Sequence, residues 1–159
     1  MSVRCWAFVF LFLAACSRPK VRDGWVHYPE AGLEIPLEES WKATKVKGIP
    51  LPVIHTEEDH GIQPNLFPVE FSPAPPEEAM RTFMVKESEQ DAELEVIGQT
   101  AIRVETRTVR KGLPLLRIYY ALPGGNGTLI VAATCAEATS ASYKRAFDRM
   151  AERARALAP

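Results

Sequence analysis

A short apolar run ahead of a cysteine constrains this chain more than any other feature. The run covers residues 5–15, only eleven positions, whereas a membrane-spanning helix needs about 20. Arg4 precedes the run, and the small residues Ala14 and Ala15 end it. A positive charge, a short apolar core and small residues at its end are the parts of a processing signal, so we expect residues 1–15 to be removed as a signal peptide.

The residues around the end of this run, Leu13-Ala14-Ala15-Cys16, resemble the lipobox of bacterial lipoproteins. The resemblance implies that the Cys16 sulfur carries a diacylglyceryl group and that Cys16 becomes the first mature residue, usually N-acylated with a fatty acid such as palmitate. A single acyl chain binds a membrane only marginally, at roughly 10⁴ M⁻¹, whereas several chains anchor stably. Two alternatives remain open: a secreted protein cleaved nearby, or a buried N-terminal helix with an accidental cysteine.

The residues after Cys16 predict where the domain is held. By the lipoprotein sorting rule, an Asp in the next position favours the inner membrane, so Ser17 favours the outer membrane, facing the periplasm, in a two-membrane cell. Residues 17–24 combine charges, a proline and a glycine without periodicity, a composition typical of a solvated tether. We therefore expect residues 16–24 to be the lipidated cysteine and a tether, and the membrane to be a partner through the lipid.

Length and charge predict one domain, residues 25–159. Removing 15 of the 159 residues leaves 144, enough to bury about two thirds of the unfolded surface in one core. Arg4 is the only charged residue removed, so 18 basic side chains remain against 20 acidic ones, a net charge of −2. This near-neutral balance has no basic footprint for nucleic acid, so nucleic-acid binding is excluded.

The cysteines permit no disulfide within the mature chain. Cys5 would leave with the signal and Cys16 would carry lipid, which leaves Cys135. Cys135 shares strand parity with Leu129 and Val131, which favours a small buried hydrophobe over the alternative of a reactive thiol. The domain must then be stabilised by its apolar core.

Short extended segments open the predicted domain. They cover residues 25–28, 33–37, 41–47, 53–56 and 65–71. Leu33, Ile35 and Leu37 alternate with other residues, which predicts a half-buried strand paired with the segment before it. Lysines predict that 41–47 lies at a sheet edge, and Pro68 predicts an edge or a bulge for the last segment.

Two helices and a meander complete the prediction. A proline and two acids favour a helix start near residue 77, with an end near 90. Strands over 94–97, 101–110, 113–122 and 128–135 follow, and the last three form a three-stranded meander. On 113–122, Leu116, Ile118 and Tyr120 share one face and Arg117 and Tyr119 the other, both largely apolar, as in a strand covered on both sides. A final amphipathic helix is expected over 139–157.

The order of these elements resembles the Mog1/PsbP-like fold. The features that carry the resemblance are Tyr28, Gly32, Leu33, Ile35, Pro36 and Trp41 in the opening hairpin, with the middle helix, meander and closing helix. The predicted fold class is therefore α+β, an antiparallel sheet packed by a middle and a C-terminal helix. The resemblance implies a binding or assembly factor, because the family shares no catalytic motif; function does not follow from fold alone. Another two-layer α+β sandwich or a lipocalin-like barrel are the alternatives.

The residues from His55 to His60 are the candidate metal ligands. Two imidazoles and three carboxylates lie within six positions, and these groups suit zinc or nickel if the loop folds them inward. A structural site normally completes a tetrahedron with thiolates or further histidines, and no thiol is near. We therefore predict no metal and no cofactor, with His55 and His60 kept as candidates and a metal- or small-ligand-binding protein as the alternative function.

The sequence predicts a protein that is not an enzyme. No serine lies in a G-x-S-x-G context, and the glycine-rich residues 124–127 precede a strand without a following Lys-Ser/Thr pair, which indicates a turn. Five aromatic residues are candidates either for a binding groove or for the core: Trp25, Tyr28, Trp41, Tyr119 and Tyr120. We expect a lipid-anchored accessory that binds or assembles another envelope protein; the sequence identifies neither the partner nor the binding residues.

Overall fold

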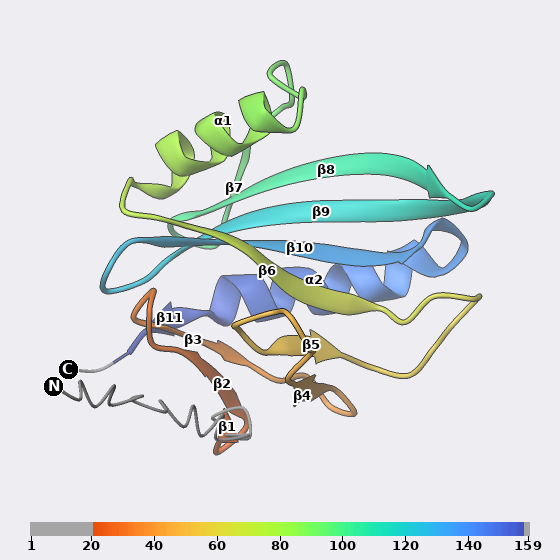
Figure 1. Cartoon of the computed structure of the whole chain (residues 1–159), viewed down its shortest axis with the longest axis horizontal. Coiled ribbons are helices and arrows are strands. Elements are labelled where there is room, and N and C mark those ends of the chain that lie inside the picture. Colours follow the sequence, from red (N-terminus) through yellow and green to blue (C-terminus); the bar gives the residue numbers. More distant parts are fainter. Residues whose placement is uncertain (1–20, 158–159) are drawn as a thin grey trace, which may run out of the picture.

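A seven-stranded antiparallel sheet is the centre of the fold (Figure 1). The computed structural model describes residues 21–157. The strands are β4 (Lys42–Thr44), β5 (Val53–His55), β6 (Asn65–Ser72), β7 (Glu95–Ile97), β8 (Ala101–Arg110), β9 (Leu113–Pro123) and β10 (Thr128–Ala136). Their order is β4-β5-β6-β10-β9-β8-β7. The β8-β9-β10 meander has the predicted boundaries to within one residue at each end, and β4 lies at the edge as predicted.

Alternate residues of β9 face two separate cores. Ile118 and Tyr120 belong to a cluster that includes Phe147 of helix α2 (Ser140–Arg153), whereas Tyr119 belongs to a cluster that includes Phe83 of helix α1 (Pro76–Lys86). The two helices therefore lie on opposite faces of the sheet (Figure 1). Both faces of β9 are covered over much of its length, as its apolar residues at both parities predict.

Pro68 lies at a bulge in β6. On β10, Val131 is paired with Pro68, but the next residue, Ile130, is paired with Glu70, so Val69 is the extra residue. Proline has no N–H to donate to the ladder, which favours such a local irregularity. Strand β5 pairs with β6 only at Asn65 and Leu66, so Pro68 has a partner on the β10 side alone, and the structure shows both the predicted edge position and the predicted bulge.

A smaller sheet packs beside α2, against the core that the buried face of α2 also covers. It contains β1 (Val21–Arg22), β2 (Trp25–Tyr28), β3 (Leu33–Pro36) and β11 (Arg155–Ala156), in the order β1-β2-β3-β11. Val21 and Arg22, which we assigned to the tether, are paired with Val26 and Trp25. The prediction was wrong for these two residues because a strand of two residues is too short to show an alternating pattern in the sequence.

Strand β3 is buried on both faces, not half-buried as predicted. Leu33 and Ile35 face the core, and Glu34 on the other side is only 8% exposed. The Glu34 carboxylate is 3.0 Å from Nε2 of His27 and accepts a hydrogen bond of 2.6 Å from Nε of Arg155. Arg155 reaches Glu34 because β11 pairs with β3, a contact between distant parts of the chain that local alternation does not reveal.

Both helices end earlier than predicted. Helix α1 ends at Lys86 because Ser88 adopts a positive φ of 62°, and the Glu89 N–H closes the end on the Met84 carbonyl at 2.8 Å. Helix α2 ends at Arg153 because Ala154 is extended, with ψ of 142°, and the chain continues into β11. Ala154 and Leu157 continue the apolar spacing that predicted a longer final helix, although the backbone leaves the helix at Ala154.

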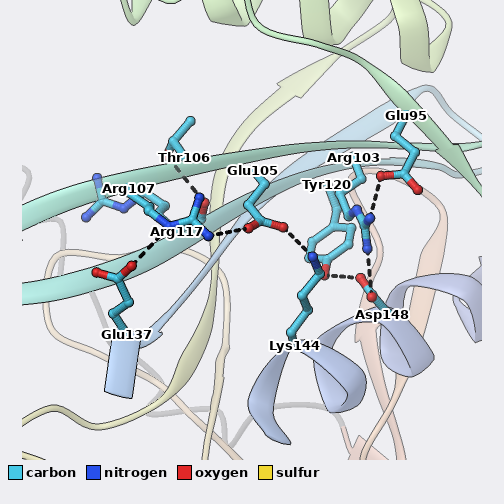
Figure 2. Close-up of polar contacts among 10 residues, drawn as sticks. All are labelled: Glu95, Arg103, Glu105, Thr106, Arg107, Arg117, Tyr120, Glu137, Lys144 and Asp148. Atoms are coloured by element: carbon cyan, nitrogen blue, oxygen red, sulfur yellow. Dashed lines mark hydrogen bonds and ion pairs between the residues drawn. The ribbon is translucent and has the colours of Figure 1, made fainter. Parts of the chain in front are cut away.

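A polar network joins α2 to the central sheet (Figure 2). Asp148 of α2 accepts hydrogen bonds of 2.7 Å from both Arg103 and Tyr120, and Arg103 also pairs with Glu95. Burial alone would lower the pKa of Arg103, but its bonds to the two carboxylates raise that pKa above the ordinary value. Neighbouring ion pairs involve Glu105, Arg107, Glu137 and Lys144. These contacts fix the helix on β8 and β9 and leave the opposite face of the sheet to α1.

Candidate functional site

The two candidate metal-binding histidines do not converge. Nδ1 of His55 is 3.4 Å from the Thr56 carbonyl oxygen, and Nδ1 of His60 is 2.6 Å from Oδ1 of Asp59. Tyr143 of α2 donates to Oδ2 of Asp59 at 2.9 Å, and these bonds, that from His60 first, lower the pKa of Asp59. Within residues 21–157, no three His, Cys, Asp or Glu side chains are grouped to hold a metal ion. The loop is tied to α2 through Asp59 instead.

The cysteine predictions fall on different parts of the chain. Cys16, the predicted lipidation site, and the signal peptide lie outside the described residues. Cys135 is fully buried in the same cluster as Leu129 and Val131, as the shared parity predicts. Burial raises the pKa of its thiol to about 11, so almost no thiolate forms near neutral pH. Cys135 is a core residue.

The five candidate aromatic residues form no continuous exposed groove. The ring of Trp25 is covered by the Arg155 guanidinium, 3.9 Å from its centroid, and Trp41 packs edge-on against Phe147 at 5.6 Å. The rest are at most 6% exposed: Tyr28, Tyr119 and Tyr120. Of the five, only Tyr119 lines a cavity on the α1 side. The aromatics therefore belong mainly to the core.

That cavity, which we call the α1-side groove, is the strongest candidate site on the described part of the chain. It has a volume of about 540 Å³, within the range of about 300–1,000 Å³ that is typical of small-molecule sites. Its lining is Val46, Ile49, Val53, Ile62, Gln63, Asn65, Phe67, Val69, Phe83, Glu87, Arg110, Leu115, Arg117, Tyr119, Ala132 and Thr134. Most of these side chains are apolar, and a few polar groups lie among them.

The groove exists because α1 is too short to cover the sheet. Eleven residues of α helix span about 16 Å, whereas the eleven residues of β9 span about 36 Å. The uncovered end of this face is walled by the segment between β4 and β5, which includes Val46 and Ile49, and by Ile62. Val46 and Val69 are each 42% exposed at the groove, so apolar surface there remains open to solvent.

Arg117 is the unusual residue of the groove. Its Nε is buried and has no hydrogen-bond partner within the described part of the chain, and an unpaired buried donor costs about 1–3 kcal/mol. It lies on β9 between Leu115 and Tyr119, which point to the same face. The other charged side chains of the lining are Arg110 and Glu87. A half-buried guanidinium whose Nε has no partner, set in an apolar cavity, is an anion-binding arrangement.

The sequence contained one sign of this site that we did not use. Arg117 stands alone among Leu115, Tyr119 and Ala121 on one face of a strand predicted to be covered on both sides. Long charged residues are rarely buried without a partner, so Arg117 indicated a polar site on an otherwise apolar, covered face of this strand. The walls of the groove had no such sign, because they come from segments far apart in the chain.

Comparison with known proteins identifies the fold but no family. No family model and no curated protein matches the chain. The crystal structure of LpqN, described as involved in cell envelope biogenesis of Mycobacterium tuberculosis, is similar with a TM-score of 0.56 and 10% identity, over 79% of this chain and 83% of that one. The solution structure of the cyanobacterial PsbP (CyanoP) from Synechocystis sp. PCC 6803 aligns with a TM-score of 0.41 and 16% identity, over 91% and 99%. The likeness to LpqN shows the fold alone and confirms the predicted α+β class.

No helix within residues 21–157 is long and apolar enough to cross a membrane.

Proposed function

We propose that this chain is a lipid-anchored protein of the bacterial cell envelope that acts as a non-catalytic binding or assembly accessory. The observation that carries the proposal is the α1-side groove, an open apolar cavity in which the Arg117 Nε has no partner. A surface of this kind is what a binding protein presents: apolar area for affinity and a few polar groups for orientation.

The proposed location rests on the N-terminal residues. Leu13-Ala14-Ala15-Cys16 supplies the cleavage and lipidation signal, and Ser17 favours the outer membrane with the domain facing the periplasm. The shared fold with LpqN, a protein described as involved in cell envelope biogenesis, supports an envelope role. A protein anchored to a bilayer diffuses within a thin layer, which raises the effective concentration of a partner bound to the same membrane.

The absence of a catalytic role is part of the proposal. A nucleophile needs an adjacent base, and the histidines of the described chain are engaged elsewhere: His27 with Glu34, His55 beside the Thr56 carbonyl and His60 with Asp59. The thiol of Cys135 is buried. The α1-side groove itself contains no histidine and no cysteine.

Photo-crosslinking in intact envelopes tests the proposed binding role. A photoreactive amino acid placed at Val69, in the groove, is compared with one at Val109, which is 67% exposed and does not line the groove. We expect a discrete adduct with one envelope protein from position 69 and none from position 109. The Phe67→Glu substitution, which places a charge in the apolar lining, should remove the adduct.

The same experiment contains the results that would contradict the proposal. Adducts of equal yield from positions 69 and 109 would indicate random encounter. An adduct at position 69 that survives Phe67→Glu would place the contact outside the groove. Circular dichroism of the Phe67→Glu chain must match that of the wild type, because only then does a lost adduct report on binding.

A further inference from the structure

The α1-side groove combines one half-buried cation, Arg117, with a mostly apolar lining. The unpartnered Nε of Arg117 lies at its floor, and Val46, Ile49, Phe67, Val69 and Phe83 supply apolar lining. From this combination we infer that the groove binds a long-chain fatty acid, with the carboxylate on Arg117 and the alkyl chain along the apolar lining. The inference rests on the proposed binding function and names the ligand class of the same site.

The charge of the groove matches a single carboxylate. Two arginines, Arg110 and Arg117, and one acid, Glu87, line it, so its formal charge is +1. The Nε–H of a guanidinium and one neighbouring Nη–H form a fork that fits the two oxygens of a carboxylate. Nε of Arg117 is buried without a partner, so this N–H of the fork lacks an acceptor. A bound carboxylate would supply the missing acceptor and balance the charge.

The floor of the groove suits an alkyl chain better than a peptide. It is a sheet face in which β10 pairs with both β6 and β9, and β9 pairs with both β8 and β10. The backbone groups of β9 and β10 are therefore engaged on both sides, whereas beyond Leu66 β6 is paired only with β10. A peptide laid across β9 and β10 would bury its own N–H and C=O groups with few partners, which is unfavourable. An alkyl chain has no such groups to satisfy.

The probe for the test is palmitic acid with a diazirine at the middle of its chain. The full chain is purified from membranes and reconstituted in phosphatidylcholine nanodiscs, then irradiated with the probe, and the labelled peptides are identified by mass spectrometry. We expect adducts on residues 65–72 and 76–87, which contain the groove residues of β6 and α1. Unlabelled palmitate should compete, and palmitic acid methyl ester, which has no charge, should compete at least tenfold less well.

Substitutions at two arginines separate the site from its surroundings. Arg117→Gln should reduce labelling roughly tenfold or more, because a charge-assisted hydrogen-bonded pair is lost, and should abolish the preference for palmitate over its methyl ester. Arg117→Lys, which keeps the charge but not the fork, should lie between. Arg107→Gln is the matched control: Arg107 is 65% exposed and paired with Glu105 and Glu137, away from the groove. It should leave labelling unchanged.

The outcomes distinguish this inference from the proposed function. Labelling spread over the chain, equal competition by the ester, or unchanged labelling in Arg117→Gln would overturn the fatty-acid site. If these results came with a groove-dependent protein adduct at Val69, the binding role would stand and its ligand would be a protein segment. Palmitate labelling at the groove without any protein adduct would support the fatty-acid site and contradict the proposal of a protein partner. Equal melting temperatures of wild type and variants keep each result interpretable.

Discussion

Phe83 of α1 packs edge-on against Tyr119 of β9, with ring centroids 5.1 Å apart and an interplanar angle of 64°. This contact lies at the junction between the covered and the open part of the sheet, because both residues also line the α1-side groove. Phe83 is only 3% exposed. The pair therefore holds α1 on the sheet and sets one wall of the groove.

We expect Phe83→Ala to lower the free energy of unfolding by about 3 kcal/mol, through lost burial and a residual cavity. Val85 is on the same helix but 59% exposed, so Val85→Ala should change stability by less than about 0.5 kcal/mol. Urea unfolding followed by circular dichroism measures both. Similar losses in the two variants would show that α1 is not anchored through the Phe83 ring.

The loop between β9 and β10 docks on the β2–β3 turn. The Gly125 N–H donates to the Gly32 carbonyl at 2.9 Å, and the Asn126 N–H donates to the Ala31 carbonyl at 3.1 Å. A Cβ on Gly124 would lie 2.0 Å from the Ala31 oxygen, whereas one on Gly125 would lie 3.6 Å from the Gly32 oxygen. The two glycines thus differ in the space available to a side chain.

This difference predicts opposite results for neighbouring substitutions. Gly124→Ala should destabilise the chain by about 2 kcal/mol or more, because backbone must move to relieve the overlap, and Gly125→Ala should be nearly neutral. Thermal unfolding of the two variants makes the comparison. A neutral Gly124→Ala would mean that the two sheets are not held together at this loop.

Much of the central sheet could be predicted from the sequence, since alternation is a local property. Leu116, Ile118 and Tyr120 share a face because residues two apart in a strand must. The burial of Glu34 was not predictable in this way, because it depends on Arg155, far away in the chain. The groove also depends on distant parts: α1 is short relative to β9, and the β4–β5 segment folds back beside it. Local patterns specify elements, whereas cavities arise where elements fail to cover one another.

Two buried tyrosines predict sensitivity to alkaline pH. Burial raises the pKa of Tyr28, whose hydroxyl donates to the Pro52 carbonyl at 3.1 Å. Burial, and then the hydrogen bond to Asp148, raise the pKa of Tyr120. Below about pH 10 both states keep these phenols neutral; above it the unfolded chain loses protons that the folded chain retains, so stability falls as pH rises.

The measurement is the phenolate absorbance of the chain during an alkaline titration. Of its four tyrosines, Tyr28 and Tyr120 should ionise only when circular dichroism reports unfolding. In Tyr120→Phe the absorbance change before unfolding should be the same as in wild type, and the change during unfolding should be smaller. Ionisation of all four near pH 10 with the fold intact would contradict the buried positions of these hydroxyls.

The lipid on Cys16 is the central claim of this account, because the proposed role depends on the domain working at a bilayer. Intact-mass and peptide mass spectrometry of the protein isolated from its native membranes test it most directly. We predict a mature chain that begins at Cys16 and carries the mass of a diacylglyceryl group, with a further acyl group on its amino terminus. A free Cys16 thiol, or a mature chain that begins at another residue, would contradict it.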